Sequence, residues 1–233
     1  FVVDYENGES SPLNVTGNHA DNVRFTYNEE TGKWAGDIQL YWTDKVTPVD
    51  VYSYYPYDAN LAEVKRYSHT ILSDQQKEVN GISGYEISDF LWAKAEKMSS
   101  SDGVISLMHN HLMAGIQVNL LKGYGFTDTE WENLEKQIII ENTQVNTWVD
   151  LATGEISLNG TEIEKEPINA IRNGDVWRAV VAPQIIPEGT VLLTACVDSV
   201  KYQHIHPIEP LEYISGKMHK FTIVVNQRLP EGD

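Results

Sequence analysis

Hydrophobic and polar residues alternate along much of the chain in short runs, the period-two pattern of strands that bury one face. In residues 116–120, three aliphatic side chains would face one way and the two polar side chains between them the other. The runs are rich in β-branched and aromatic residues and are bounded by turn residues, so we predict an all-β protein. Strands are expected around residues 25–27, 33–34, 38–42, 49–55, 89–93, 104–107, 111–120, 138–140, 148–150, 154–156, 177–181, 191–197 and 221–225.

Two local signals add detail to this pattern. Residues 25–34 read as a β-hairpin, because Gly32 can take the positive φ that its turn needs. Thr127 and Glu130 have the spacing of a capping box, which predicts a short helix at 128–136 that covers a sheet. Residues 73–77 have weaker helical character. Helix should remain below about a fifth of the chain, against ~30% in an average globular protein.

The polar, turn-rich stretch Met98–Gly103 is the best linker candidate. We therefore expect an N-terminal β-sandwich domain at residues 1–98 and a C-terminal β-sandwich domain at residues 99–233, because regularly spaced strands are typical of sandwiches. The side chains expected in the cores include Trp92, Ile116, Val118, Leu193 and Ile223.

The net charge of the chain limits which molecules it can bind. The chain has 34 acidic and 17 basic residues, a formal net charge of −17, which repels nucleic acid and anionic membrane surfaces. No apolar run approaches the ~18 residues that span a bilayer, so no transmembrane segment is expected. The first residues lack the basic and apolar regions of a signal peptide, and we expect this start to be mature or trimmed.

Motifs for common chemistry are missing. The sequence has no Gly-x-Ser-x-Gly elbow, phosphate-binding glycine loop or His-Glu-x-x-His pair. Acidic residues are too numerous to single out a catalytic carboxylate pair, and a solvated surface explains them better. Cys196 is the single cysteine, which excludes an intramolecular disulfide, and we expect a buried, inert thiol. We predict no catalytic residues, no cofactor and no cofactor-binding residues.

Two histidine pairs could bind a metal. His109 with His111, and His204 with His206, have the i, i+2 spacing that places two imidazoles on one face of a strand, where they could hold zinc or copper. No carboxylate is visibly placed to orient the rings. We therefore favour unrelated histidines with backbone partners and predict no metal site.

Aromatic residues gather in one segment. Tyr52, Tyr54, Tyr55 and Tyr57, together with Trp42, could form a platform on which sugar rings stack. We favour core packing, because alternate members of such a strand must face inward.

In their order, several motifs resemble the fimbrillin-like family of Bacteroides-type bacteria, and the resemblance runs from about Phe25 to Val225. In the first half it rests on Trp34, Tyr41-Trp42, Val49–Tyr52, Tyr54–Tyr57, Asp74-Gln75, Gly84-Tyr85 and Ser88–Ala93. In the second half it rests on Val104–Leu107, His111–Val118, Asp150–Gly154, Val181–Gln184 and Gly216–Ile223. His111 matches a histidine of the family, which further weakens the metal interpretation, whereas His109 departs from an aromatic position.

The resemblance implies two transthyretin-like β-sandwich domains, export as a lipoprotein, and a non-enzymatic structural or adhesive subunit of fimbriae at the extracellular face of the outer membrane. Its partners would be other fimbrial subunits, joined by β-strand donation, and host or bacterial surface glycans or proteins. Residues 226–233 contain a proline and no alternation, so we expect an exposed, mobile tail that makes a poor donor strand. This favours an anchor, tip or accessory subunit, unless the donor strand was removed or lies near Phe1. The alternative is a carbohydrate-binding cell-surface lipoprotein.

Overall fold

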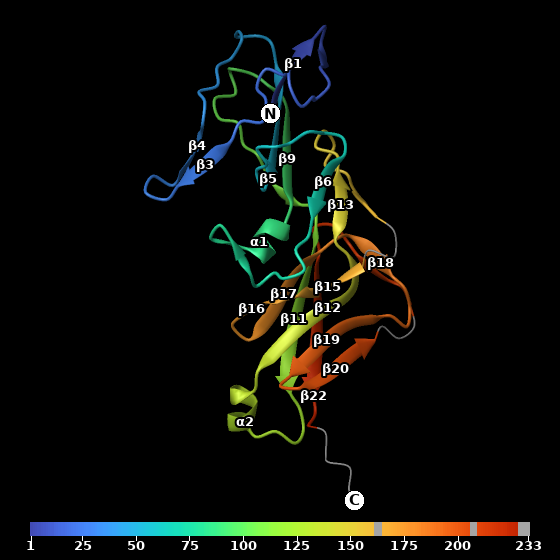
Figure 1. Cartoon of the computed structure of the whole chain (residues 1–233). Coiled ribbons are helices and arrows are strands. Elements are labelled where there is room, and N and C mark those ends of the chain that lie inside the picture. Colours follow the sequence, from blue (N-terminus) through green and yellow to red (C-terminus); the bar gives the residue numbers. More distant parts are fainter. Residues whose placement is uncertain (161–164, 206–208, 228–233) are drawn as a thin grey trace, which may run out of the picture. The chain divides into compact units, whose positions relative to one another are not determined.

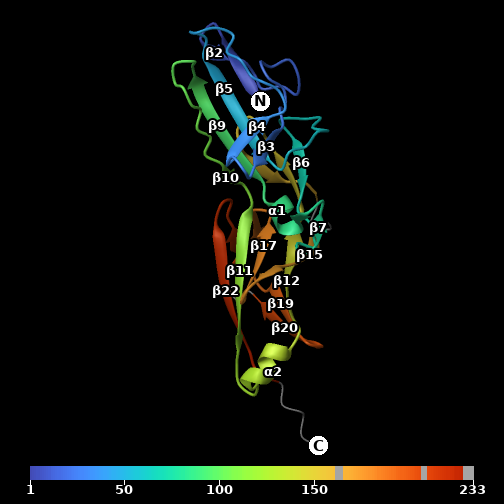
Figure 2. The ribbon, with the colours of Figure 1, turned by 90° about the vertical axis from the view of Figure 1, so that its left-hand side faces the viewer.

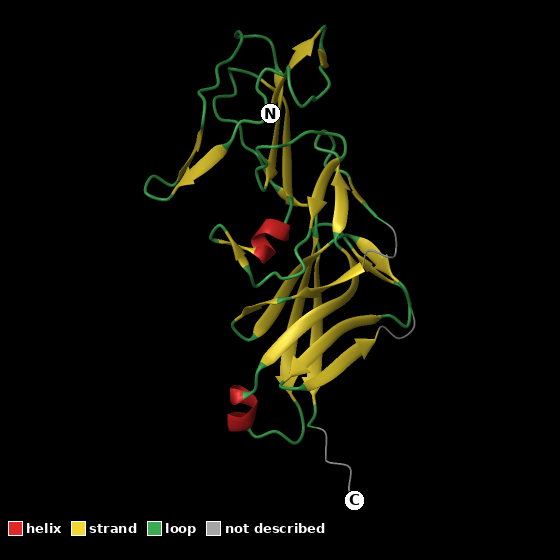
Figure 3. Ribbon diagram, viewed as in Figure 1, coloured by secondary structure: helices red, strands yellow, loops and turns green. Residues whose placement is uncertain are grey.

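The structure is a computed structural model that describes residues 1–160, 165–205 and 209–227 (Figure 1). Of these residues 49% are in strands and 5% in helices, which confirms the all-β prediction (Figure 3). The chain forms two compact units, each assembled from separate stretches: unit 1 from residues 1–68, 90–111 and 148–156, and unit 2 from residues 69–89, 112–147 and 157–233. A domain boundary after residue 98 and a transthyretin-like topology stay predictions.

Unit 1 contains a five-stranded sheet in the order β10-β9-β5-β1-β2. Its strands are β1 (Val2–Glu6), β2 (Glu9–Ser10), β5 (Val49–Tyr55), β9 (Leu91–Met98) and β10 (Asn110–His111). The predicted hairpin is confirmed as β3 (Phe25–Asn28) and β4 (Lys33–Gly36), which pair only with each other within the described residues. Gly32 takes the expected positive φ of 64° at its turn.

A buried carboxylate holds the first strands of unit 1 to the sheet. Asp50 is 1% exposed and accepts hydrogen bonds from Tyr5 Oη at 2.9 Å, Ser10 Oγ at 2.9 Å and the Lys97 backbone N–H at 3.0 Å. Burial by itself would raise the pKa of Asp50, but these three hydrogen bonds and the nearby Lys94 ammonium outweigh it and lower that pKa. The carboxylate is therefore a structural tie between three segments of the chain.

Unit 2 is built on two four-stranded sheets whose apolar faces form a buried core (Figure 2). The first runs in the order β16 (Ile171–Asn173), β17 (Val176–Val181), β11 (Ala114–Lys122), β22 (Met218–Val225). The second runs in the order β15 (Lys165–Asn169), β12 (Lys136–Gln144), β19 (Val191–Val197), β20 (Val200–Ile205). β11 and β22 are parallel, with Ile116 opposite His219. Within the described residues the edge strands are β16 and β22 in the first sheet, and β15 and β20 in the second.

Shorter elements complete the chain. They are the sheet of β14 (Ile156–Leu158), β13 (Asn146–Val149) and β6 (Tyr67–Thr70), the pair β18 (Gln184–Ile186) and β21 (Leu211–Tyr213), the pair β7 (Glu78–Val79) and β8 (Ile82–Ser83), and the helices α1 (Gly84–Ser88) and α2 (Asp128–Asn133). The capping box of Thr127 and Glu130 is confirmed, although α2 ends three residues before the expected limit. Neither helix of the described chain is long and apolar enough to cross a membrane.

Three expectations about local structure are wrong. Residues 38–42 and 104–107 form no strand, and Ile38 and Val104 are 57% and 83% exposed. Within the described residues no strand pairs with these two segments. An unpaired strand would leave its backbone groups unsatisfied. Residues 73–77 are not helical, because the side chain of Gln75 is fully buried and hydrogen-bonded to Val180 instead.

The core prediction holds for Ile116, Val118 and Leu193, each 0% exposed. It is wrong for Trp92 and Ile223, which are half-buried. The Trp92 indole N–H donates to Leu151 O at 2.8 Å, and its ring lies so close to Gly154 that a Cβ there would approach Trp92 Cε3 to 2.6 Å. The Cys196 thiol, expected to be buried, is half-buried on β19.

Candidate functional site: an open groove between two sheet edges

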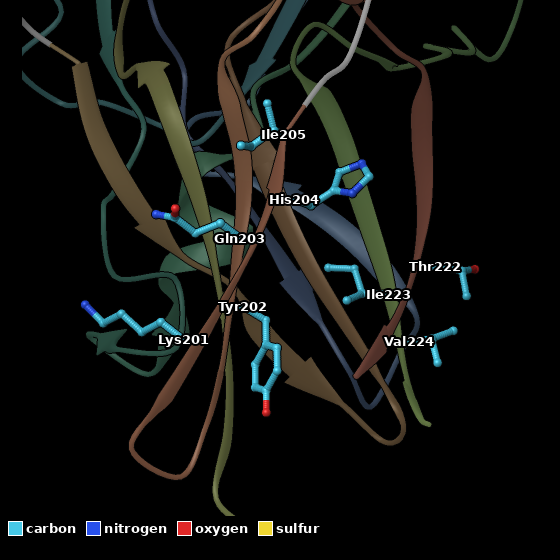
Figure 4. A pocket seen from close by; sticks show the side chains of 8 residues that line it. All are labelled: Lys201, Tyr202, Gln203, His204, Ile205, Thr222, Ile223 and Val224. Atoms are coloured by element: carbon cyan, nitrogen blue, oxygen red, sulfur yellow. The ribbon is translucent and has the colours of Figure 1, made fainter. Parts of the chain in front are cut away.

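A groove of about 820 Å³ opens on unit 2 between the terminal strands of its two sheets (Figure 4). Five residues of β20, Lys201–Ile205, and three residues of β22, Thr222–Val224, line it. Both strands are paired on one side only within the described chain: β20 with β19, and β22 with β11. The groove is thus bordered by two sheet edges, each paired with its sheet on the other side.

The side chains of the groove separate into two sets. Tyr202 and Ile223 are half-buried, whereas Thr222 and Val224 are exposed. Figure 4 shows Ile223 and His204 pointing into the space between the two strands, and Thr222 and Val224 pointing away from it. The His204 ring meets Phe221 edge-on, with 6.2 Å between ring centroids. The lining of the groove is therefore mixed, because apolar and aromatic side chains lie beside polar ones.

The hydrogen bonds of β22 show which of its backbone groups face the open side. Gly115 and Gly123 donate their N–H groups to the carbonyl oxygens of Lys217 and Val225, both at 2.8 Å. Backbone groups alternate in direction along a strand, so the odd-numbered residues of β22 face β11. Thr222 and Val224 therefore present their N–H and C=O groups at the free edge.

A sheet edge that is paired on one side only could accept another strand. A strand added to β22 or β20 would satisfy the free N–H and C=O groups and could place alternate side chains on Tyr202 and Ile223. Lys201 and Lys220 are exposed on these two strands. Lysines of this kind hinder unspecific edge-to-edge pairing.

The predicted histidine pairs lie in different units. His204 lines the groove, and His206 lies outside the described residues. His109 and His111 are exposed residues of unit 1, and the His109 Nε2 lies 2.8 Å from Ser53 Oγ. Across residues 1–160, 165–205 and 209–227, no three histidine, cysteine, aspartate or glutamate side chains gather in a way that could hold a metal ion. That the chain binds no metal stays a prediction.

The aromatic segment is only partly a core. Tyr52 is 7% exposed, and the half-buried Tyr54 stacks on Phe90 at 6.0 Å and donates from its hydroxyl to Asn22 Oδ1 at 2.8 Å. Burial raises the pKa of Tyr54 to about 12. Tyr57 and Trp42, in contrast, are 40% and 36% exposed. Core packing is thus confirmed for Tyr52, holds in part for the half-buried Tyr54 and Tyr55, and is wrong for Tyr57 and Trp42.

Sequence reasoning missed the groove. No strand was expected at 200–205, where the pattern Val200, Tyr202 and His204 alternates with polar residues and could have indicated β20. The strand β22 was expected, but nothing in the sequence marks it as an edge.

Fold and site together define an all-β, sandwich-type protein with a groove between two sheet edges. The chain belongs to the fimbrillin-like family, whose model matches residues 3–233. This confirms the resemblance found in the sequence. A comparison with curated proteins gave no match.

Three solved structures share the fold at 17% sequence identity each. A candidate cell adhesion protein from Bacteroides uniformis ATCC 8492 matches with a TM-score of 0.72, over 97% of this chain and 85% of its own. A candidate cell adhesion protein from Bacteroides ovatus ATCC 8483 matches with a TM-score of 0.62, over 84% and 70%. A fimbrial protein from Bacteroides ovatus ATCC 8483 matches with a TM-score of 0.56 over 98% of this chain, which spans 45% of that protein.

Proposed function

We propose that this chain is a non-enzymatic structural or adhesive subunit of cell-surface fimbriae that accepts a β-strand from a neighbouring subunit in the groove between β20 and β22. Membership of the fimbrillin-like family supports the fimbrial role. The groove carries the proposal, because it lies between two sheet edges that are paired on one side only within the described residues, and because Tyr202 and Ile223 offer apolar surface between them. The subunit would be exported as a lipoprotein to the extracellular face of the outer membrane.

The dimensions of the edge suit a donor strand. β22 has eight residues, so its free edge extends over about 26 Å at ~3.3 Å per residue. Each hydrogen bond gained there contributes roughly 0.5–1.5 kcal/mol net, and an apolar donor side chain buried on Ile223 or Tyr202 adds roughly 1.5–3 kcal/mol. Together these free energies of hydrogen bonding and burial favour a stable contact between subunits over a transient one.

Substitution of Thr222 by proline tests whether a donor strand pairs with β22. Thr222→Pro removes an N–H that faces the free edge and leaves the bonds to β11 in place, since edge strands tolerate proline at such positions. Thr222→Ala keeps the N–H and is the matched control. Fimbriae are isolated from cells that produce each variant and are probed with an antibody to this chain. We expect Thr222→Ala, but not Thr222→Pro, in the fibres.

Equal incorporation of both variants, with folding checked by circular dichroism, would contradict strand acceptance at β22. The same immunogold images test position. We propose an anchor, tip or accessory subunit, for which label lies at one end of each fibre. Label repeated along the shaft would refute the terminal position and leave the strand-accepting role intact.

The second candidate function, a carbohydrate-binding surface lipoprotein, is favoured by one observation. Several large aromatic side chains of unit 1 face solvent, including Trp34 at 63% and Tyr41 at 75% exposed. The groove does not explain these residues, because it lies on unit 2. The two functions are compatible in one subunit.

A further inference from the structure

The hairpin β3–β4 has two chemically different faces. Cross-strand partners share a face, and the register pairs Phe25 with Gly36 and Tyr27 with Trp34. One face therefore carries Phe25, Tyr27 and Trp34, which we call the aromatic face. The opposite face carries the remaining pairs, which are Thr26 with Ala35 and Asn28 with Lys33.

The aromatic face is open to solvent. Phe25, Tyr27 and Trp34 are 48%, 48% and 63% exposed. A cross-strand pair of Tyr27 and Trp34 helps to hold the hairpin together, and this explains why the rings lie opposite each other. It does not explain why about half or more of each of these three residues remains exposed. A two-stranded hairpin is marginal in water, so three exposed rings on it are a costly arrangement without a binding role.

The ring geometry leaves faces free for a ligand. The Tyr27 and Trp34 centroids lie 5.3 Å apart and the rings are tilted by 53°, so they do not stack on each other. Phe25 lies across to β4, where a Cβ on Gly36 would meet Phe25 Cζ at 3.1 Å. Because Gly36 has no side chain, the Phe25 ring has room to lie over this part of β4. Together the three rings form a short, bent aromatic strip.

The size of the aromatic face limits which ligands it can bind. A hairpin of four residue pairs is about 14 Å long at ~3.4 Å per residue and about 10 Å wide across two strands, so its face measures on the order of 140 Å². A specific protein partner needs about 800 Å² on each side. The aromatic face therefore suits a few sugar residues better than a folded protein.

The negative charge of the chain distinguishes between acidic and neutral glycans as ligands. The net charge of the chain is −17, and in or beside the hairpin the acidic Glu29, Glu30 and Asp37 outnumber the basic Arg24 and Lys33. Acidic glycans are repelled by such a surface. The C–H faces of neutral pyranose rings are attracted by exposed aromatic faces and carry no charge to be repelled.

We propose that the aromatic face of the β3–β4 hairpin, formed by Phe25, Tyr27 and Trp34, binds the neutral pyranose rings of a glycan. The site deepens the adhesive part of the proposed function and does not depend on strand acceptance in the groove.

The test begins with the full chain on an array of neutral oligosaccharides of mannose, galactose, glucose and N-acetylglucosamine, printed beside sialylated glycans and a basic peptide. We expect binding to neutral oligosaccharides that is insensitive to salt. Calorimetry with the strongest neutral oligosaccharide then compares variants. Trp34→Ala and Tyr27→Ala should each weaken binding about tenfold or more, the scale of one lost stacking contact.

Three controls separate stacking from folding. Tyr27→Phe keeps the ring and should keep affinity within about threefold of the wild type. Lys33→Ala on the opposite face, and Tyr124→Ala, which removes a 79% exposed ring of unit 2, should leave binding unchanged. The proposal is overturned by the absence of neutral-glycan binding, by binding only to sialylated glycans or to the basic peptide, or by unchanged affinity in Trp34→Ala.

The two proposals fail separately. Thr222→Pro should bind the oligosaccharide normally although it is missing from fibres. Trp34→Ala should enter fibres normally although it binds sugar poorly.

Discussion

The side chain of Gln75 forms two hydrogen bonds with the backbone of Val180, 105 residues away. Its amide N–H donates to Val180 O at 2.7 Å, and Val180 N–H donates to Gln75 Oε1 at 2.8 Å. Both groups are buried. A single side chain thus occupies the place of a neighbouring strand beside β17 and satisfies backbone groups that would otherwise be orphaned.

Gln75→Ala should therefore destabilise the chain strongly. It leaves the N–H and C=O of Val180 unpaired, at roughly 1–3 kcal/mol for each group. Urea unfolding measures the loss. Gln76→Ala, at the exposed neighbouring position, is the matched control and should change the free energy of unfolding by less than about 0.5 kcal/mol. Equal effects of the two substitutions would show that the paired hydrogen bonds do not matter.

Truncation in the core of unit 2 should also be costly. Ile116→Ala and Leu193→Ala each remove buried methyl groups from fully buried positions, for an expected loss of about 2–5 kcal/mol. Leu121→Ala, on the same strand as Ile116 but 49% exposed, should cost much less. Unchanged thermal stability in both core variants would contradict the inward face assigned to β11 and β19.

Acid should weaken unit 2 through His219. Its Nε2 accepts a hydrogen bond from the Ile214 N–H at 3.1 Å, which requires the unprotonated nitrogen, and burial lowers the pKa of His219. The folded state thus favours neutral His219, and this contribution is complete above the unfolded pKa of about 6.5. It is lost as the pH falls through that value towards the lower folded pKa.

Urea unfolding at pH 7.5 and pH 5.0 tests this. His219→Gln keeps an acceptor but does not titrate, so it should lose less stability on acidification than the wild type. Thr222→Ala, which changes a non-titrating residue of the same strand, should retain the wild-type loss. An identical loss in His219→Gln would assign the pH dependence to other groups, among them His69, whose pKa is also lowered by burial.

Metal analysis tests the histidine pairs. Protein purified without chelators should contain less than one equivalent of zinc or copper, because His109 and His111 belong to unit 1 while His204 lies in the groove of unit 2. A tightly bound stoichiometric ion that disappears in His204→Ala would reverse this prediction.

Much of the local structure was readable in the sequence, because its signals act over a few residues. The alternation in 116–120, the hairpin around Gly32 and the capping box at Thr127 all appear as expected, although the strand expected at 111–120 is divided between β10 and β11. The helix α1 was missed although Ser83 and Glu86 form a second capping box. Its signal was present, but the five-residue helix is too short for an apolar periodicity.

Alternation alone could not tell which runs become strands. Residues 38–42 and 104–107 have the pattern and remain irregular, because a strand forms only where a second strand accepts and donates its backbone hydrogen bonds. Composition likewise could not separate the buried Tyr52 from the exposed Tyr57, five positions apart in one aromatic segment.

By itself the sequence determined the all-β class, most of the longer strands and the family resemblance, because these depend on local periodicity and on the order of motifs. Only the tertiary structure decided which strands lie at the edges. β22 pairs in parallel with β11, about a hundred residues earlier, and β20 pairs with β19 alone within the described chain. A strand is an edge strand when no further strand pairs with its second side. No local sequence pattern shows whether such a partner strand exists. The groove follows from such long-range pairing, whereas the aromatic face of the hairpin comes from the local pairing of β3 with β4.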